Sequence, residues 1–75
     1  MKAPVELIPV ESSMLSAVGY DAEAKELIAV FQSGGTWRYR EVPKAIYDGL
    51  LEASSKGSYM HAHVLNVFAD YRVSR

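Results

Sequence analysis

The chain has 75 residues, which allows a single domain near the lower size limit for independent folding. Apolar residues make up 49% of it and charged residues 23%, an ordinary globular composition that argues against disorder. The net charge of −1 argues against strong non-specific binding to nucleic acid, and the lack of cysteine excludes disulfides, thiolate metal sites and a cysteine nucleophile.

The sequence also bears on location. Residues 1–6 contain no long apolar run after their positive charge, so they do not resemble a signal peptide. No stretch approaches the roughly 20 apolar residues that a transmembrane helix needs. We therefore expect a cytoplasmic protein that does not bind a membrane.

The charges are distributed unevenly along the chain. Residues 1–35 contain two basic and five acidic residues, a net charge of −3, whereas residues 36–75 contain six basic and four acidic residues, a net charge of +2. Such a tilt steers an anionic partner toward the second half of the chain. It is also common in proteins that have no such partner.

Three segments have the alternation or the apolar content of β-strands. Residues 14–20 alternate, residues 25–32 are apolar on both faces as in a central strand, and residues 36–42 alternate again. Residues 21–24 predict a short hairpin loop, and the two glycines of residues 33–35 supply the positive φ angles of a tight turn. The pattern therefore predicts an antiparallel meander.

The alternation also predicts which side chains share a face of the sheet. One set is Leu15, Ala17 and Gly19, opposite Ser16, Val18 and Tyr20; another is Trp37, Tyr39 and Glu41, opposite Arg38, Arg40 and Val42. Residues 5–10 add a candidate edge strand, which Pro9 confines to the edge or shortens.

Two helices are predicted after the strands. Pro43 fits the first turn of a helix that ends near residue 54, with Gly57 as its C-terminal cap. Ser58 is positioned to cap a second helix over residues 59–71. The apolar positions at helical spacing are Ile46, Tyr47, Leu50 and Leu51 in the first helix, and Met60, Val64, Val67, Phe68 and Tyr71 in the second.

These elements predict an α+β fold for residues 1–75, taken as one domain. We expect an antiparallel three- to four-stranded meander followed by two α-helices packed on one face of the sheet, because that arrangement buries both helical stripes.

Several short motifs follow one another over about residues 10–71. They are Val10-Glu11-Ser12-Ser13, Val18-Gly19-Tyr20-Asp21, Leu27-Ile28-Ala29-Val30-Phe31 with Ser33-Gly34-Gly35, Val42-Pro43 with Tyr47 and Leu50, and Ser55-Lys56-Gly57-Ser58-Tyr59. Their order resembles the KTSC domain, a short module named after the C-terminus of some lysyl-tRNA synthetases and also found as a stand-alone bacterial protein. The family's central Tyr-x-Tyr is replaced here by Trp37-Arg38-Tyr39, which keeps the aromatic character. For the function, the resemblance implies only that RNA binding has been suggested for the family.

Trp37 and Tyr39 lie two residues apart, so they share one strand face. That spacing suits the stacking of bases or sugar rings. We favour the other interpretation, in which both rings pack under the helices, because a domain of this size needs its large aromatic residues in the core.

No catalytic or metal-binding arrangement emerges from the sequence. His61 and His63 lie about 200° apart around a helix, so they cannot chelate one ion from a regular helix. Ser12 and Ser13 have no base placed to activate them, and paired serines after a strand more often cap a turn. We therefore expect no metal, no cofactor and no enzymatic activity.

The function predicted from the sequence is a small binding module. RNA is the first candidate partner, with phosphate contacts from five basic residues of the second half: Arg38, Arg40, Lys44, Arg72 and Arg75. A protein partner is the alternative, as in an adaptor or regulator of a bacterial complex, because the net charge is near zero and an open strand edge can pair with another chain.

Overall fold

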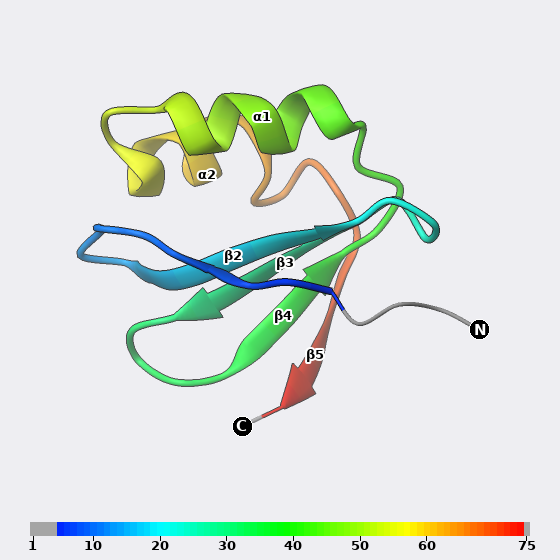
Figure 1. Ribbon diagram of the computed structural model, residues 1–75, viewed down its shortest axis with the longest axis horizontal. Helices are drawn as coiled ribbons and strands as arrows, with labels where there is room; N and C mark the ends of the chain where they lie inside the picture. The colour runs from blue at the N-terminus through cyan, green and yellow to red at the C-terminus, as the bar shows by residue number, and fades with distance from the viewer. Residues whose placement is uncertain (1–4, 75) are drawn as a thin grey trace.

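A five-stranded antiparallel sheet carries two helices on one of its faces (Figure 1). The computed structural model describes residues 5–74. The elements in chain order are β1 (Ile8–Pro9), β2 (Leu15–Asp21), β3 (Glu26–Phe31), β4 (Thr36–Tyr39), α1 (Lys44–Glu52), α2 (Lys56–His63) and β5 (Asp70–Ser74). The α+β prediction is therefore confirmed, and the sheet has one strand more than the largest number predicted.

The strands lie in the order β1-β2-β3-β4-β5, and each pairs antiparallel with its neighbour. The central strand β3 is buried on both faces, as its apolar sequence predicts. The turn before β4 contains Gly34 and Gly35 with φ angles of 100° and 94°, which confirms the predicted glycine turn. The chain leaves the sheet after β4, forms both helices and returns to pair with the outer edge of β4 (Figure 1).

The predicted second helix is present, but its predicted extent over residues 59–71 is wrong. Helix α2 ends at His63, Asn66 takes a left-handed φ of 65°, and β5 follows. The helical stripe continues past Val64 in the sequence, but Val67 is 60% exposed. Strand β5 forms backbone hydrogen bonds with the edge of β4 that would otherwise face solvent. These hydrogen bonds join distant segments of the chain, so the local periodicity of residues 59–71 does not predict them.

The boundary between the helices also differs from the prediction. Gly57 lies inside α2 and does not cap the first helix. Ser55, and not Ser58, caps α2, since its hydroxyl accepts a hydrogen bond of 3.3 Å from the backbone N–H of Ser58. Pro43 occupies the N-cap of α1 and is not its first helical residue.

In two places the side chains do not follow the predicted alternation between the two faces of the sheet, because the backbone departs from a regular strand. A register shift in β2 between Leu15 and Ala17 turns Leu15 into the core together with Val18, so Leu15 does not share a face with Ala17. Strand β4 ends at Tyr39, and Glu41 takes a φ of 54°. Val42 is consequently buried and Glu41 exposed, the reverse of the prediction that Glu41 shares the face of Trp37 and Tyr39.

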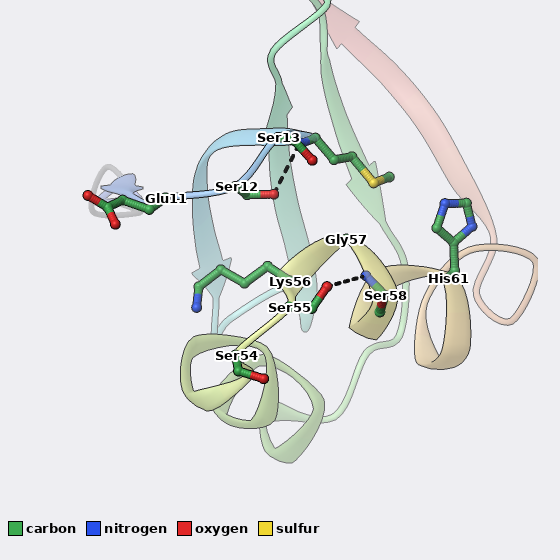
Figure 2. A pocket seen from close by; sticks show the side chains of 10 residues that line it. Glu11, Ser12, Ser13, Ser54, Ser55, Lys56, Gly57, Ser58 and His61 are labelled. Carbon is green, nitrogen blue, oxygen red and sulfur yellow. Dashed lines mark hydrogen bonds between the residues drawn. The ribbon is translucent and has the colours of Figure 1, made fainter.

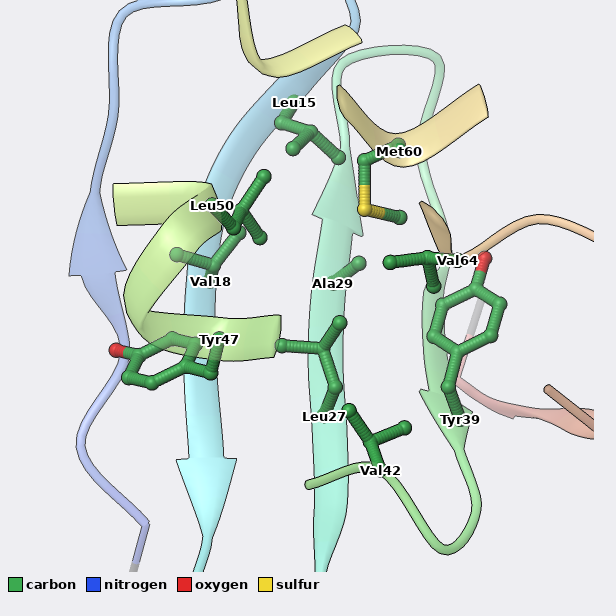
Figure 3. Close-up of a cluster of buried hydrophobic side chains, with 10 residues drawn as sticks. All are labelled: Leu15, Val18, Leu27, Ala29, Tyr39, Val42, Tyr47, Leu50, Met60 and Val64. Atoms are coloured by element: carbon green, nitrogen blue, oxygen red, sulfur yellow. The ribbon is translucent and has the colours of Figure 1, made fainter. Parts of the chain in front are cut away.

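The core lies between the sheet and the helices (Figure 3). Its members are Leu15, Val18, Leu27, Ala29, Tyr39, Val42, Tyr47, Leu50, Met60 and Val64. Among the residues that the structure describes, no helix is long and apolar enough to cross a membrane.

Candidate nucleic-acid interface

The face of the sheet opposite the helices carries the candidate interface, and we call it the open face. Paired residues of adjacent antiparallel strands point to the same side of a sheet, so the register defines a row across this face. The row consists of Gly19, Ile28, Arg38 and Tyr71, one residue from each of β2 to β5. A Cβ at Gly19 would lie 2.9 Å from the Leu7 side chain, so the N-terminal segment covers that end of the row and leaves the β4–β5 end accessible.

Arg38 is held by two carboxylates in the middle of the open face. Its Nη1 atom lies 2.7 Å from Oε1 of Glu26 and 3.4 Å from Oδ2 of Asp21. The Tyr71 hydroxyl donates a hydrogen bond of 2.9 Å to the same oxygen of Glu26. These contacts connect β2, β3, β4 and β5 through side chains alone.

The network shifts the titration of its members. Burial by itself raises the pKa of Glu26, but hydrogen bonds from Arg38 and Tyr71 outweigh that effect and hold the pKa below its usual value. The hydrogen bond to Glu26 raises the pKa of Arg38, despite the opposing effect of burial, and the same carboxylate raises the pKa of Tyr71. Arg38 is therefore a charged residue whose guanidinium is already paired within the protein.

Arg40 and Tyr71 form the accessible part of the interface. The guanidinium carbon of Arg40 lies 5.9 Å from the centroid of the Tyr71 ring, within the range of a cation–π contact. Tyr71 is 41% exposed, and Arg40 is exposed and makes no ion pair with any residue in the described range 5–74. An aromatic ring and a cation therefore lie side by side on the solvent-exposed surface of the sheet.

Of the other basic residues predicted to contact RNA, two lie away from the open face and one lies outside the described residues. Lys44 is on α1, where its Nζ atom is 3.1 Å from the carboxylate of Asp48. Arg72 lies on the helix-covered face, since it pairs with Trp37 across β4 and β5. Arg75 lies outside the described residues. The structure therefore brings Arg38 and Arg40 together and leaves Lys44 and Arg72 off the open face.

The aromatic pair is on the helix-covered face. Tyr39 is 2% exposed and belongs to the core, while Trp37 is partly buried and packs against the core margin. Burial, together with the charge of Asp70, raises the pKa of Tyr39 to about 12. Tyr71, for which the sequence pattern predicts a helix, is an exposed aromatic residue of the open face. The alternation of polar and apolar side chains from Asp70 to Val73 was the local signal for the strand that carries it.

A groove of about 520 Å³ lies between the turn at Ser12 and the start of α2 (Figure 2). Several of its polar side chains form hydrogen bonds with backbone groups. The Ser12 hydroxyl accepts hydrogen bonds of 3.1 Å from the N–H groups of Met14 and Leu15, and Lys56 donates to the carbonyls of Leu51 and Ala53 at the end of α1. These contacts give the serines and Lys56 a structural role.

The two histidines have different surroundings. His61 lines the groove, and the His63 ring lies 4.5 Å from that of Tyr59. Within residues 5–74 no group of three His, Asp or Glu side chains is arranged to hold a metal ion.

Most of the sequence motifs have structural roles in this fold. The Tyr20 hydroxyl donates a hydrogen bond of 2.5 Å to the carbonyl of Val42, and its ring stacks on Tyr47 at 5.5 Å. The Tyr59 hydroxyl donates a hydrogen bond of 2.9 Å to the carbonyl of Ile46. Asp21 accepts hydrogen bonds from the backbone of the β2–β3 turn. The motifs therefore account for the fold, and the exposed pair of Arg40 and Tyr71 lies outside them.

Comparison with known proteins places these observations in a family. The KTSC domain model matches residues 11–68. A protein of Tsukamurella paurometabola is 43% identical over 75% of this chain and 84% of that protein. A protein of Stutzerimonas stutzeri is 39% identical over 72% of this chain and 76% of that protein. A lysine–tRNA ligase of a Nostoc species is 32% identical over 83% of this chain and 11% of the ligase. The crystal structure of a KTSC domain protein from Yersinia pestis superposes with a TM-score of 0.92 at 27% identity, covering 95% of this chain and all of that one.

Proposed function

This chain belongs to the KTSC domain family, and on that premise we propose that it is a small RNA-binding module that holds single-stranded RNA on its open face. The observation that carries the proposal is the exposed pair of Arg40 and Tyr71, with 5.9 Å between the guanidinium carbon and the ring centroid. Exposed aromatic rings on an antiparallel sheet stack with unpaired bases, and a neighbouring arginine contacts the phosphate or the base plane.

The charges of the open face favour weak, salt-sensitive binding. Arg38 is paired with two carboxylates, so its main role is to hold the surface in place. A single phosphate contact from Arg40 gives a log–log salt slope of about −0.7 for a single strand. The net charge of −1 adds no general attraction to RNA.

One relative supports an RNA partner independently of this geometry. A lysine–tRNA ligase contains a segment that is 32% identical to 83% of this chain. A protein that uses tRNA therefore carries a module of the same family, and an RNA-contacting role for such a module is consistent with that setting.

The proposal is tested by fluorescence anisotropy with labelled mixed-sequence single-stranded RNA and with tRNA, each at two salt concentrations. We expect the single strand to bind and the binding to weaken at the higher salt. Arg40→Gln reduces the affinity, whereas Lys44→Gln is the matched control, because Lys44 is an exposed cation on α1 that pairs with Asp48. An absence of binding to both RNAs at low salt contradicts the proposal.

A protein partner is the second candidate function, and β5 favours it. Strand β5 is the last strand of the sheet within the described chain, and its Tyr71 and Val73 side chains are 41% and 51% exposed. An extended segment of another protein can add to such an edge through backbone hydrogen bonds. If RNA does not bind, this edge is the surface to test with candidate protein partners.

A further inference from the structure

A second hollow of about 340 Å³ lies on the helix-covered side of the sheet, beside the β3–β4 hairpin. Aromatic and apolar side chains form most of its wall, and one carboxylate contributes to it. The lining includes Phe31, Trp37, Tyr39, Met14, Leu65 and Asp70. Its size suits a single planar ring system, since ligand pockets of a few hundred Å³ hold small molecules.

The charged groups in and beside this hollow come from β5. Asp70 pairs with Tyr39 and Arg72 pairs with Trp37, so both charged residues lie on the same face as the two aromatic residues. A Cβ at Gly35 would lie 2.8 Å from the Nη2 atom of Arg72, which places the guanidinium over the hairpin next to the hollow. Guanidinium groups carry five N–H donors, so Arg72 can contact an anion in addition to its protein neighbours.

We propose that this hollow binds a guanine base, with Trp37 as stacking surface, the Asp70 carboxylate on the base edge and Arg72 toward the phosphate. The inference rests on the proposed RNA-binding function and names the base that the module selects. The Watson–Crick edge of guanine presents two adjacent donors, N1–H and N2–H₂, and a carboxylate accepts from both in a bidentate manner. Adenine presents an acceptor, N1, at the corresponding position, which a carboxylate repels.

The electrostatics favour a ligand of this kind over a simple cation or anion. Asp70 and Arg72 carry opposite charges and alternate along one strand, so the site complements a neutral base with donors on its edge and a negative group attached to it. Burial, together with the charge of Asp70, raises the pKa of Tyr39 to about 12, and the phenol at the wall of the hollow is protonated near neutral pH.

The hollow is within reach of the open face because β5 lies at the edge of the sheet. Tyr71 projects to the open face, whereas Asp70 and Arg72 project to the other. One RNA strand that crosses the β5 edge can therefore stack a base on Tyr71 and insert a neighbouring guanine into the hollow.

Trp37 is the single tryptophan of the chain, so its fluorescence reports directly on the hollow. We would titrate the full chain with GMP, AMP, guanosine, and hexamers of uridine that contain one central guanine or one central adenine. GMP and the guanine hexamer are expected to change the emission at concentrations about fivefold or more below those of their adenine counterparts, as a bidentate pair discriminates bases. Asp70→Asn removes this preference, and Arg72→Gln removes the advantage of GMP over guanosine.

Asp48→Asn is the matched control, since it removes an exposed carboxylate on α1, and it keeps the preference for guanine. Circular dichroism verifies that each variant is folded. Equal responses to GMP and AMP, or a guanine preference that survives Asp70→Asn, overturn the inference. A response to GMP without one to the guanine hexamer overturns the RNA source of the base. If the guanine-containing and adenine-containing hexamers bind equally well, the inference is overturned but the proposed function stands. If no RNA binds in the anisotropy assay, the proposed function itself is rejected.

Discussion

The Arg38 guanidinium lies 2.7 Å from the Glu26 carboxylate, on the face of the sheet that the helices leave open. Glu26 also accepts the hydrogen bond from Tyr71, so one carboxylate positions both a cation and the exposed ring of the proposed RNA surface. The arrangement connects the last strand to the centre of the sheet. It therefore supports both the stability of β5 and the geometry of the candidate interface.

Glu26→Gln should weaken this network and change its dependence on pH. The pKa of Glu26 is lower in the folded chain, so its stabilisation is present above the unfolded value of 4.5 and is lost as the pH falls through the folded pKa. We expect the variant to lose about 1–2 kcal/mol at pH 7 and less at acidic pH. Urea unfolding at pH 7 and pH 3 measures this difference. Glu23→Gln, at an exposed turn position, is the control, and an equal loss at both pH values contradicts the prediction.

Gly49→Ala should destabilise the chain although alanine is the better helix former by about 1 kcal/mol. A Cβ at Gly49 would collide with the Tyr59 ring, 2.9 Å from its Cζ atom, and displace the hydroxyl from the Ile46 carbonyl. Thermal unfolding of Gly49→Ala beside Tyr59→Phe measures the effect. Phe removes only the hydrogen bond and should cost about 1 kcal/mol, whereas Gly49→Ala should cost more. A stabilised Gly49→Ala variant would show that helix propensity prevails over this contact.

The β3–β4 turn should distinguish two glycines of similar conformation. Gly34 and Gly35 have φ angles of 100° and 94°, so alanine at either position should cost about 1–2 kcal/mol in backbone strain. The space around Gly34 is open, but Gly35 faces Arg72, so Gly35→Ala should cost more than Gly34→Ala. Urea melts rank the two variants, and full stability in both contradicts the turn assignment.

Trp37→Ala tests whether the aromatic residue at the core margin contributes to stability. Trp37 is partly buried, so we expect a loss of about 2–3 kcal/mol, below the roughly 3–5 kcal/mol of a fully buried tryptophan. Urea unfolding followed by circular dichroism measures it. A variant that unfolds like the parent would show that Trp37 belongs to the surface alone.

The sequence predicted those features whose cause is local. The apolar run over residues 27–31 specified a central strand, and the two glycines after Ser33 specified a turn, because each pattern requires no information from elsewhere in the chain. The local signal for strand β5 was ambiguous, since the alternation from Asp70 to Val73 indicates a strand but covers only four residues. The spacing of Val64, Val67 and Tyr71 instead fits a helix, and the unpaired edge of β4 decides between the two structures.

The candidate interface was predictable only in part for the same reason. Arg38 and Arg40 were identified from their charge and spacing, but the pairing of Arg38 with Glu26 depends on the register of β3 and β4. The contact between Arg40 and Tyr71 depends on β5, and the sequence pattern predicts a helix that extends into the residues of this strand.

The central claim is that the exposed ring of Tyr71 stacks with RNA, and a comparison of Tyr71→Phe with Tyr71→Leu tests it most directly. Both variants lose the hydrogen bond to Glu26, so they differ in the ring alone. Base–aromatic stacking is worth about 1–3 kcal/mol, so Tyr71→Leu should weaken binding of single-stranded RNA in anisotropy titrations by about fivefold or more relative to Tyr71→Phe. Equal affinities of the two variants for single-stranded RNA would contradict the account.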